Sequence, residues 1–450
     1  MLHWKSDKWF GIQRLQGVNP VLIKLCTKIP DNLNVDDTML RPFLETLTIE
    51  EAIQSQKLFL VDLGIVEGVP PAPGTQLCAP MGLFYLNKNS ELLPVAIQLF
   101  QHKGGDNLVF LPSDPPNLWL LAKMFFNNAE VQHHESLTHL GFTHLMMEGV
   151  VICSHRHLSV SHPLFRLMAP HFLFLISINV VALQDLIAPG KWVDRVMTVR
   201  ASGLQEIVKR GLQDWRLDRD GVIPRQVAAR GVADPSVLPY YPYRDDACAL
   251  YSIIERYVRA VLEAAYSQPG SLQADHELQQ WRKELTMARQ HGGVGMCGVA
   301  GDSEQGFTSV DQVVEVVTAL VSICSQGHAA ANFGQFDEYG FVPNYPPVLY
   351  GPVPSSKDAV PSDRDLLNYL PGRFATREIM VITKLLSFRG TRALGDFEVR
   401  YIYDPVGSAA ADRLRGELRE LARQIDRRNA TAQFPYKWQS PSVVPNAISV

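Results

Sequence analysis

Residues 116–157 read PNLWLLAKMFFNNAEVQHHESLTHLGFTHLMMEGVVICSHRH, and this stretch decides the fold class. The residues that open it, Ser113-Asp114-Pro115-Pro116, combine an N-cap residue type with proline in the first turn, which is typical of a helix start. Helical periodicity runs over residues 118–151, interrupted only by Gly141 and Gly149. Because several faces of this segment are apolar, we expect one unusually long helix in the core of a mainly α-helical protein.

A small β-rich region precedes this helix. Within residues 57–112, apolar side chains alternate as in strands over 58–61, 81–86 and 93–100, and the polar run 87–90 is typical of a turn. The simplest interpretation is a small antiparallel sheet near the N-terminus.

The second half of the chain is predicted to be helical, with an apolar tail. Residues 308–312 have capping-box spacing before a nearly all-apolar helix. Leucines and an isoleucine at helical spacing over 414–425 mark an amphipathic surface helix. After Asn429 the chain is rich in proline and large apolar residues, so we expect it to be extended and docked on the body. Residues 1–450 are therefore predicted to form one large helical domain with a small antiparallel β-sheet.

Composition sets mild bounds on function. The 450 residues are 46% hydrophobic and 20% charged, as in an ordinary globular protein, and the net charge of −4 gives no support for a nucleic-acid partner. The six cysteines are scattered without a Cys-x-x-Cys pair, which argues against a disulfide framework or a thiolate zinc site and favours a reducing, cytoplasmic compartment. The longest apolar run, 172–183, is too short to span a bilayer.

Histidines are concentrated on the long helix. Eight of the thirteen histidines lie between His133 and His171. His134 and His139 are five residues apart, which on a regular α-helix separates them by about 140°. One π-helical turn would bring them to the same face, and such turns concentrate at functional sites. The alternative is that each is an ordinary buried histidine satisfied by hydrogen bonds.

Two further features supply metal-ligand chemistry. The spacing of His328 and Asn332 places both side chains on one helix face. The apolar terminus suggests that the Val450 carboxylate is buried, and such a group needs a partner. Three imidazoles, one amide and one carboxylate suit a redox-active ion such as iron better than structural zinc. Each feature alone also fits a buried polar pair or a packed tail.

Several separated blocks, in the same order along the chain, resemble those of lipoxygenases, and of animal members more than plant members. They cover almost the whole sequence: Trp119–Lys123, His134-Glu135, His139-Leu140, Thr143–Leu145, His162-Pro163, Ile178-Asn179, Tyr241–Asp246, His328–Gln335 and Asn446–Val450.

The resemblance implies a non-haem iron dioxygenase. The ligands of one Fe²⁺/Fe³⁺ ion would be His134, His139, His328, Asn332 and the carboxylate of Val450, with Gln335 orienting Asn332. The substrates would be O₂ and a polyunsaturated fatty acid with a 1,4-cis,cis-pentadiene. An Fe(III)-bound hydroxide would abstract hydrogen, and the product would be a hydroperoxide. A peripheral membrane contact is a further expectation for such a lipid enzyme.

The resemblance also implies four substrate-pocket residues. Ala182 matches a position where alanine is typical of enzymes forming S products and glycine of those forming R products. Leu186 resembles a leucine that packs over the pentadiene. Val196 and Met197 resemble a pair that sets pocket depth, and their bulk indicates oxygenation nearer the methyl end.

Two alternatives remain at this point. A hydroperoxide isomerase would use the same iron site. A truncated, catalytically silent lipid-binding protein belongs to another functional class. The second arises because the chain is expected to lack the family's N-terminal β-sandwich domain and the start of the catalytic domain.

Overall fold

The computed structural model describes residues 2–450, and one long interrupted helix runs through its middle. This helix has three consecutive parts: α4 (Pro116–His133), the π-helical segment η3 (His134–Leu145) and α5 (Met146–His157). The predicted core helix is therefore confirmed, and its middle twelve residues are wound as a π-helix. Nearly all of α4 is buried, as its apolar faces require.

The predicted antiparallel sheet is also present. Its strands lie in the order β1-β2-β3-β4-β5, and each pairs antiparallel with its neighbours. Asn87 forms the predicted turn, since its Oδ1 accepts from the amides of Asn89 and Glu91. The strands are β1 (Lys24–Leu25), β2 (Leu58–Asp62), β3 (Met81–Leu86), β4 (Leu92–Gln98) and β5 (Val109–Phe110).

The N-terminal helix crosses the sheet at close range. Gly11 of α1 (Asp7–Gln16) lies against the backbone of Leu92, and a Cβ built on Gly11 would lie 1.8 Å from the Leu92 carbonyl oxygen. Only glycine permits this approach. On another side of the sheet, short helices cover a second apolar cluster; they are α2 (Asp37–Leu40), η1 (Arg41–Phe43) and α3 (Ile49–Gln54).

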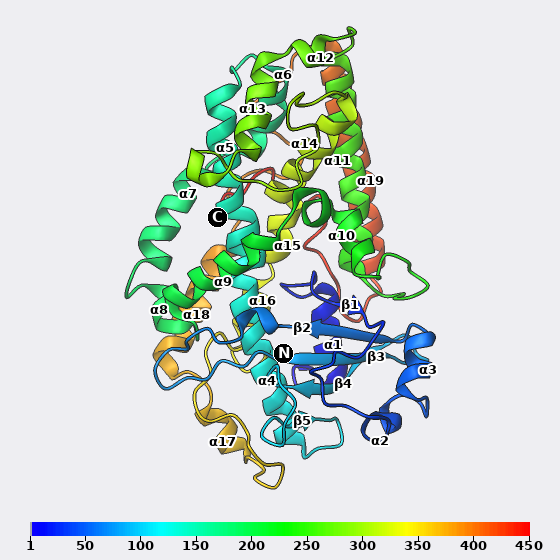
Figure 1. Ribbon diagram of the computed structural model, residues 1–450, viewed down its shortest axis with the longest axis vertical. Coiled ribbons are helices and arrows are strands. Elements are labelled where there is room, and N and C mark those ends of the chain that lie inside the picture. The colour runs from blue at the N-terminus through cyan, green and yellow to red at the C-terminus, as the bar shows by residue number, and fades with distance from the viewer. Residues whose placement is uncertain (1) are drawn as a thin grey trace.

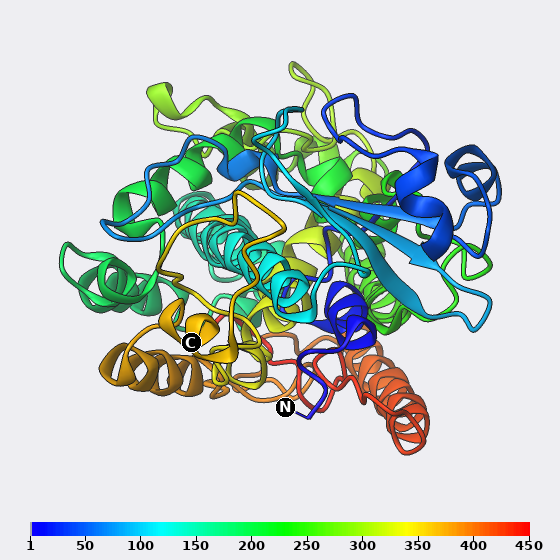
Figure 2. The same ribbon diagram turned by 90° about the horizontal axis from the view of Figure 1, so that it is seen from below.

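Helices surround the rest of the central helix, and the sheet and α7 lie on opposite sides of it (Figures 1 and 2). The helices that follow the central helix along the chain, up to residue 291, are α6 (Pro163–Met168), η4 (Ala169–His171), α7 (Leu175–Ala182), η5 (Leu183–Ile187), α8 (Trp192–Val196), α9 (Arg200–Asp214), η6 (Leu217–Gly221), α10 (Ile223–Ala229), α11 (Pro242–Ala265), α12 (Ser271–Ala274), α13 (His276–Thr286) and η7 (Arg289–His291). The short η2 (Gly64–Val66) follows β2.

A second broken helix lies beside the central one. It consists of α14 (Val310–Ser322), the π-helical segment η8 (Ile323–Gly327), α15 (His328–Asn332) and α16 (Gln335–Tyr339). Ser309 and Gln312 form the predicted capping box. Although residues 310–339 are long and apolar enough to cross a membrane, 89% of the apolar window is buried inside the protein, as in a core helix.

The C-terminal part wraps around the body. It contains α17 (Asp363–Asn368), α18 (Arg373–Leu386) and α19 (Pro405–Asn429). The leucines of α19 are buried as predicted. The tail is docked, because Asn446 donates its backbone N–H to Arg392 and Ile448 is fully buried.

Candidate metal centre and its cavity

The π-helical winding of η3 aligns side chains five residues apart. His134, His139 and His144 therefore stack along one face. The ring centroids of His134 and His139 are 6.0 Å apart, and those of His139 and His144 are 5.1 Å apart. The predicted alignment of His134 and His139 is present, and the same winding extends it to His144.

Three imidazoles converge at one point. The candidate ligand atoms of His139, His144 and His328 all lie within 4.8 Å of one another, and all three residues are buried. The Nε2 atoms of His144 and His328 are 3.1 Å apart. The helix α15 brings His328 to this point from a distance of 184 residues along the chain.

His134 lies one π-turn before this group, and its role as a metal ligand remains a prediction. Its Nε2 donates to the carbonyl oxygen of Ala331 at 2.8 Å, and its Nδ1 accepts from the hydroxyl of Tyr339 at 2.6 Å. The repeated spacing of five residues also places His144 on this face, a residue that was not predicted as a ligand from the sequence.

Neighbouring side chains orient two of the converging rings. His139 Nδ1 donates to the Glu135 carboxylate at 3.1 Å, and His144 Nδ1 donates to Asn179 Oδ1 at 2.9 Å. Asn179 is itself fixed, because its amide donates to Glu148 at 2.6 Å. Such bonds direct each Nε2 lone pair inward. Glu135, Asn179 and Glu148 were not singled out as functional from the sequence.

The chemistry of the cluster fits a cation. Among residues 2–450, His139 Nε2 and His328 Nδ1 are buried nitrogens with no hydrogen-bond partner, which is costly unless something binds there. Burial, and then the neighbouring His139, lower the pKa of His144 to about 3. Burial likewise holds the pKa of His328 well below its usual value. The rings of His144 and His328 are therefore neutral, which is the form that binds metal ions.

The remaining predicted ligands lie around the cluster. Asn332 follows His328 by one helical turn, and its Oδ1 accepts from Gln335 Nε2 at 3.0 Å, as expected for an orienting residue. The Asn332 amide donates to the carbonyl of Leu386 at 2.6 Å. Val450 lines the same cavity as His139 and His144, so the docked tail ends beside them.

A cavity of about 310 Å³ opens beside His139 and His144. Ala182, Leu186 and Met197 line it, as expected of substrate-pocket residues, but Val196 does not. Val196 is fully buried in the core, because consecutive residues at the end of α8 point in different directions. Other lining residues were not predicted as pocket residues, since they come from several separate helices; they include Leu140, Ile178, Trp192, Val193, Leu204, Ile382, Leu385 and Leu386.

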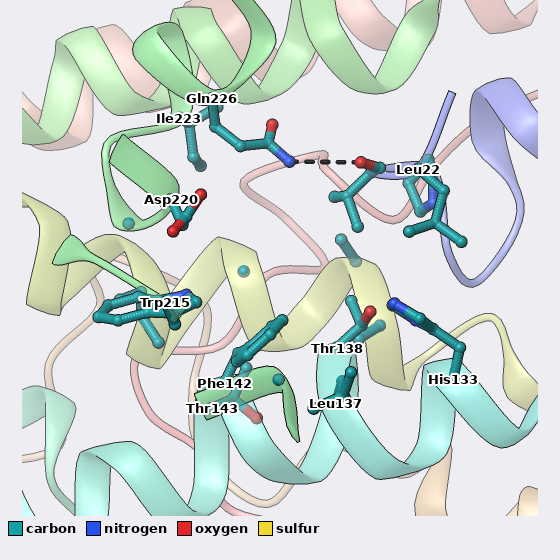
Figure 3. Close-up of a pocket in the computed structure, with 18 of the residues that line it drawn as sticks. Leu22, His133, Leu137, Thr138, Phe142, Thr143, Trp215, Asp220, Ile223 and Gln226 are labelled. Carbon is teal, nitrogen blue, oxygen red and sulfur yellow. Dashed lines mark hydrogen bonds between the residues drawn. The ribbon is translucent and has the colours of Figure 1, made fainter. Parts of the chain in front are cut away.

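A second cavity of about 310 Å³ lies against another face of η3 (Figure 3). Leu137, Thr138 and Phe142 contribute from η3, and Trp215 lies across from them. The Gln226 amide donates to the backbone carbonyl of Val21 at its edge. None of the three converging histidines lines this cavity.

Comparison with known proteins identifies relatives over the whole chain. The family model described as Lipoxygenase matches residues 1–447. The polyunsaturated fatty acid lipoxygenase ALOX15B of Rattus norvegicus is 34% identical, over 100% of this chain and 66% of that protein. The hydroperoxide isomerase ALOXE3 of Mus musculus is 31% identical, over 100% of this chain and 63% of that protein.

Solved structures agree on the fold. The crystal structure of a lipoxygenase in complex with arachidonate matches with a TM-score of 0.94 at 29% identity, covering 99% of this chain and 67% of that chain. The present chain therefore spans about two thirds of the length of the relatives it matches.

Proposed function

Because the chain belongs to the lipoxygenase family, we propose that it is an iron-dependent dioxygenase that converts polyunsaturated fatty acids with a 1,4-cis,cis-pentadiene into hydroperoxides. One observation carries the proposal: three buried imidazoles converge beside a largely apolar cavity that two of them, His139 and His144, line. Neutral imidazoles suit non-haem iron, and an apolar cavity suits an acyl chain. A relative crystallised with arachidonate supports the substrate class.

His139 and His328 would hold the iron, with Asn332 and the carboxylate of Val450 as further ligands. The third imidazole would come from His134, as the family resemblance implies, or from His144, which converges with His139 and His328. When bound, iron supplies the one-electron redox chemistry that removal of a hydrogen atom from the pentadiene requires. Glu135 and Asn179 hold the rings of His139 and His144 in register for the ion. Gln335 limits the rotation of the Asn332 amide and so sets how strongly that residue binds.

The cavity walls position the substrate and exclude water. Ala182 at the end of α7 and Leu186 of η5 line the cavity, as does Met197, which follows directly after α8. The lining includes the carboxylate of Asp185 but no lysine or arginine among the described residues. Because a fatty-acid carboxylate would find repulsion and no cation inside, the methyl end enters first. This insertion favours oxygenation nearer the methyl end.

Exposed apolar side chains surround the same cavity. Val181 of α7 and Leu385 of α18 line it and are about half exposed, at 53% and 54%. Neighbouring Val180, Leu183 and Val381 are similarly exposed. Since large exposed apolar patches mark lipid or protein contacts, the proposal includes a peripheral membrane contact at this side.

One experiment separates the candidate functions. Purified protein of known iron content is incubated with linoleic or arachidonic acid in air, and the products are identified by chromatography and mass spectrometry. Conjugated-diene hydroperoxides are expected. Conversion of added hydroperoxide without O₂ consumption would instead favour a hydroperoxide isomerase, an activity named for one relative. Full iron occupancy with neither reaction would overturn both catalytic proposals and leave a lipid-binding protein.

A further inference from the structure

A second group of metal-ligating side chains lies away from the histidine cluster. Cys153 and His157 are four residues apart on α5 and therefore share one helix face. Glu284 faces them from α13. The thiol, imidazole and carboxylate atoms of these three residues all lie within 4.8 Å of one another.

The donor set has a recognisable preference. A thiolate, an imidazole and a carboxylate are ligands of zinc, which commonly takes three protein ligands and one water. We propose that Cys153, His157 and Glu284 bind one divalent cation with the ligand preference of Zn²⁺, and that a water molecule completes the coordination. The sequence carries no Cys-x-x-Cys pair to mark such a site, and Glu284 lies more than a hundred residues from Cys153 along the chain.

Burial suits such a site. Cys153 is fully buried, whereas the side chains of His157 and Glu284 are 23% and 12% exposed. The thiol thus closes the inner side, and the cation and its water approach past the imidazole and carboxylate. Scattered acidic surface clusters lack this arrangement, in which an interior soft donor is combined with two donors at the rim.

The present contacts show what the cation would replace. His157 Nε2 and the Glu284 carboxylate are hydrogen-bonded, and the Cys153 thiol donates to the carbonyl of Trp281 at 3.5 Å. Burial, and then the Glu284 charge, raise the pKa of the Cys153 thiol to about 12. Cation binding therefore releases the thiol proton to solvent, forming the metal–sulfur bond in its place without any redox change.

Arg156 forms an ion pair with the same carboxylate but does not block it. Its guanidinium pairs with Glu284 Oε1, while His157 contacts Oε2. Carboxylate ligands are commonly held by such an outer partner, which fixes their orientation. The arginine charge would weaken the site, but it is 54% exposed and so is partly screened by solvent.

The cation would join two elements. The helix α5 continues directly from η3, which carries His139 and His144, whereas α13 is a separate helix. A bound cation would clamp α13 to the end of the iron-binding helix and would stabilise the folded state by mass action.

Cobalt(II) provides the test, because a thiolate ligand gives a sulfur-to-cobalt charge-transfer band that the histidine cluster, which has no sulfur ligand, cannot give. Chelator-treated full-length protein is titrated with Co²⁺, and the bound cobalt is then displaced with Zn²⁺. We expect the band at about one thiolate-bound cobalt per chain. It should disappear in Cys153→Ser, and His157→Gln should weaken cobalt binding at least about tenfold.

Cys297→Ser is the matched control, because Cys297 is the exposed thiol and the main candidate for adventitious binding. It should retain the band in full. Zn²⁺ should also raise the Tm of the unaltered protein and of Cys297→Ser, but not that of His157→Gln. Absence of the band in the unaltered protein, or its loss in Cys297→Ser alone, would overturn the proposal. If Cys153→Ser fails to fold, an unweakened band in His157→Gln would do the same.

Discussion

At the scale of single residues, the imidazoles of η3 differ in their hydrogen-bond partners. His144 contacts Asn179 through one nitrogen and His328 through the other. His134 contacts the Ala331 carbonyl and the Tyr339 hydroxyl. A ring binds a metal through a free lone pair, so either histidine must give up one of these contacts when it binds an ion.

Iron retention tests this distinction. We expect His139→Ala and His328→Ala each to lower the iron content to less than about one tenth of that of the unaltered protein, because each removes a ligand. His134→Gln and His144→Gln are compared in the same assay, and the variant that loses its iron identifies the third imidazole. Iron is measured by elemental analysis of folded protein. Full iron occupancy in both His134→Gln and His144→Gln would show that neither residue is a ligand.

Ala182 bears on the stereochemistry of the product. It lines the cavity beside Leu186, and its methyl group occupies space through which O₂ could approach one end of the pentadienyl radical. The unaltered protein should therefore form mainly S products, and Ala182→Gly should shift them toward R chirality at another carbon. Chiral chromatography of the reduced products measures the ratio. A mainly R product from the unaltered protein would contradict this role.

Replacing Met197 and replacing Val196 are expected to have different effects. Met197 lines the cavity, whereas Val196 is fully buried outside it. Met197→Ala should deepen the cavity and move oxygenation toward the carboxyl end. Since each methylene in a pocket is worth about 1–3 kcal/mol, the positional ratio should change roughly tenfold or more. Val196→Ala should instead lower stability and leave the positional ratio unchanged. Equal shifts of the positional ratio in Met197→Ala and Val196→Ala would mean that the residues lining the cavity do not set its depth.

At the scale of elements, the docked tail presents its own end to the metal centre. His171 Nδ1 donates to the carbonyl of Asn446 at 2.7 Å, and the Asn446 side chain bonds Gly395 and Asp396. A Cβ on Gly390 would lie 2.4 Å from the Ser449 carbonyl oxygen, so the tail runs in a tight channel. Few positions are open to Val450 once these contacts form.

Extending the C-terminus should therefore abolish activity. Added residues convert the Val450 carboxylate into an amide, which is uncharged and a weaker metal ligand, and they have no room beside the histidines. A C-terminal tag should remove both iron and activity, while the same tag at the N-terminus should leave them unchanged. Iron content and product formation are compared for the two proteins. Equal activity of both would show that Val450 serves only in packing.

At the scale of the whole molecule, buried neutral histidines make stability depend on pH. Burial lowers the pKa of His171 to about 4 and that of His133 to about 3, whereas the unfolded value is about 6.5. Between these values the unfolded chain binds more protons than the folded one. Stability is therefore complete above about pH 6.5 and is lost as the pH falls.

The pH dependence can be isolated at His171, whose Nε2 is buried without a partner among the described residues. From pH 7 to pH 5, this group alone should lower the free energy of unfolding by about 2 kcal/mol. His171→Gln cannot take up the proton. Its stability deficit relative to the unaltered protein should therefore shrink by about that amount over the same range, measured by denaturant titration. A constant deficit would show that His171 is not neutral when buried.

The sequence alone determined the main elements and the family. Apolar periodicity over 118–151 predicted the central helix, alternation within 57–112 predicted the sheet, and a proline-rich apolar tail predicted docking; all three are present. These features depend on neighbouring residues along the chain, which a local pattern records. The separated sequence blocks likewise identified the family correctly.

Only the tertiary structure decided which residues meet. Which ring lies beside His328 depends on where α15 crosses η3, since that crossing places His328 beside His144 and the Ala331 carbonyl beside His134. The same holds for Met197 against Val196, and for Glu284 beside Cys153 and His157. Spacing along a helix fixes which side chains share a face. Which face meets which partner is fixed by packing between segments more than a hundred residues apart, and no local pattern encodes it.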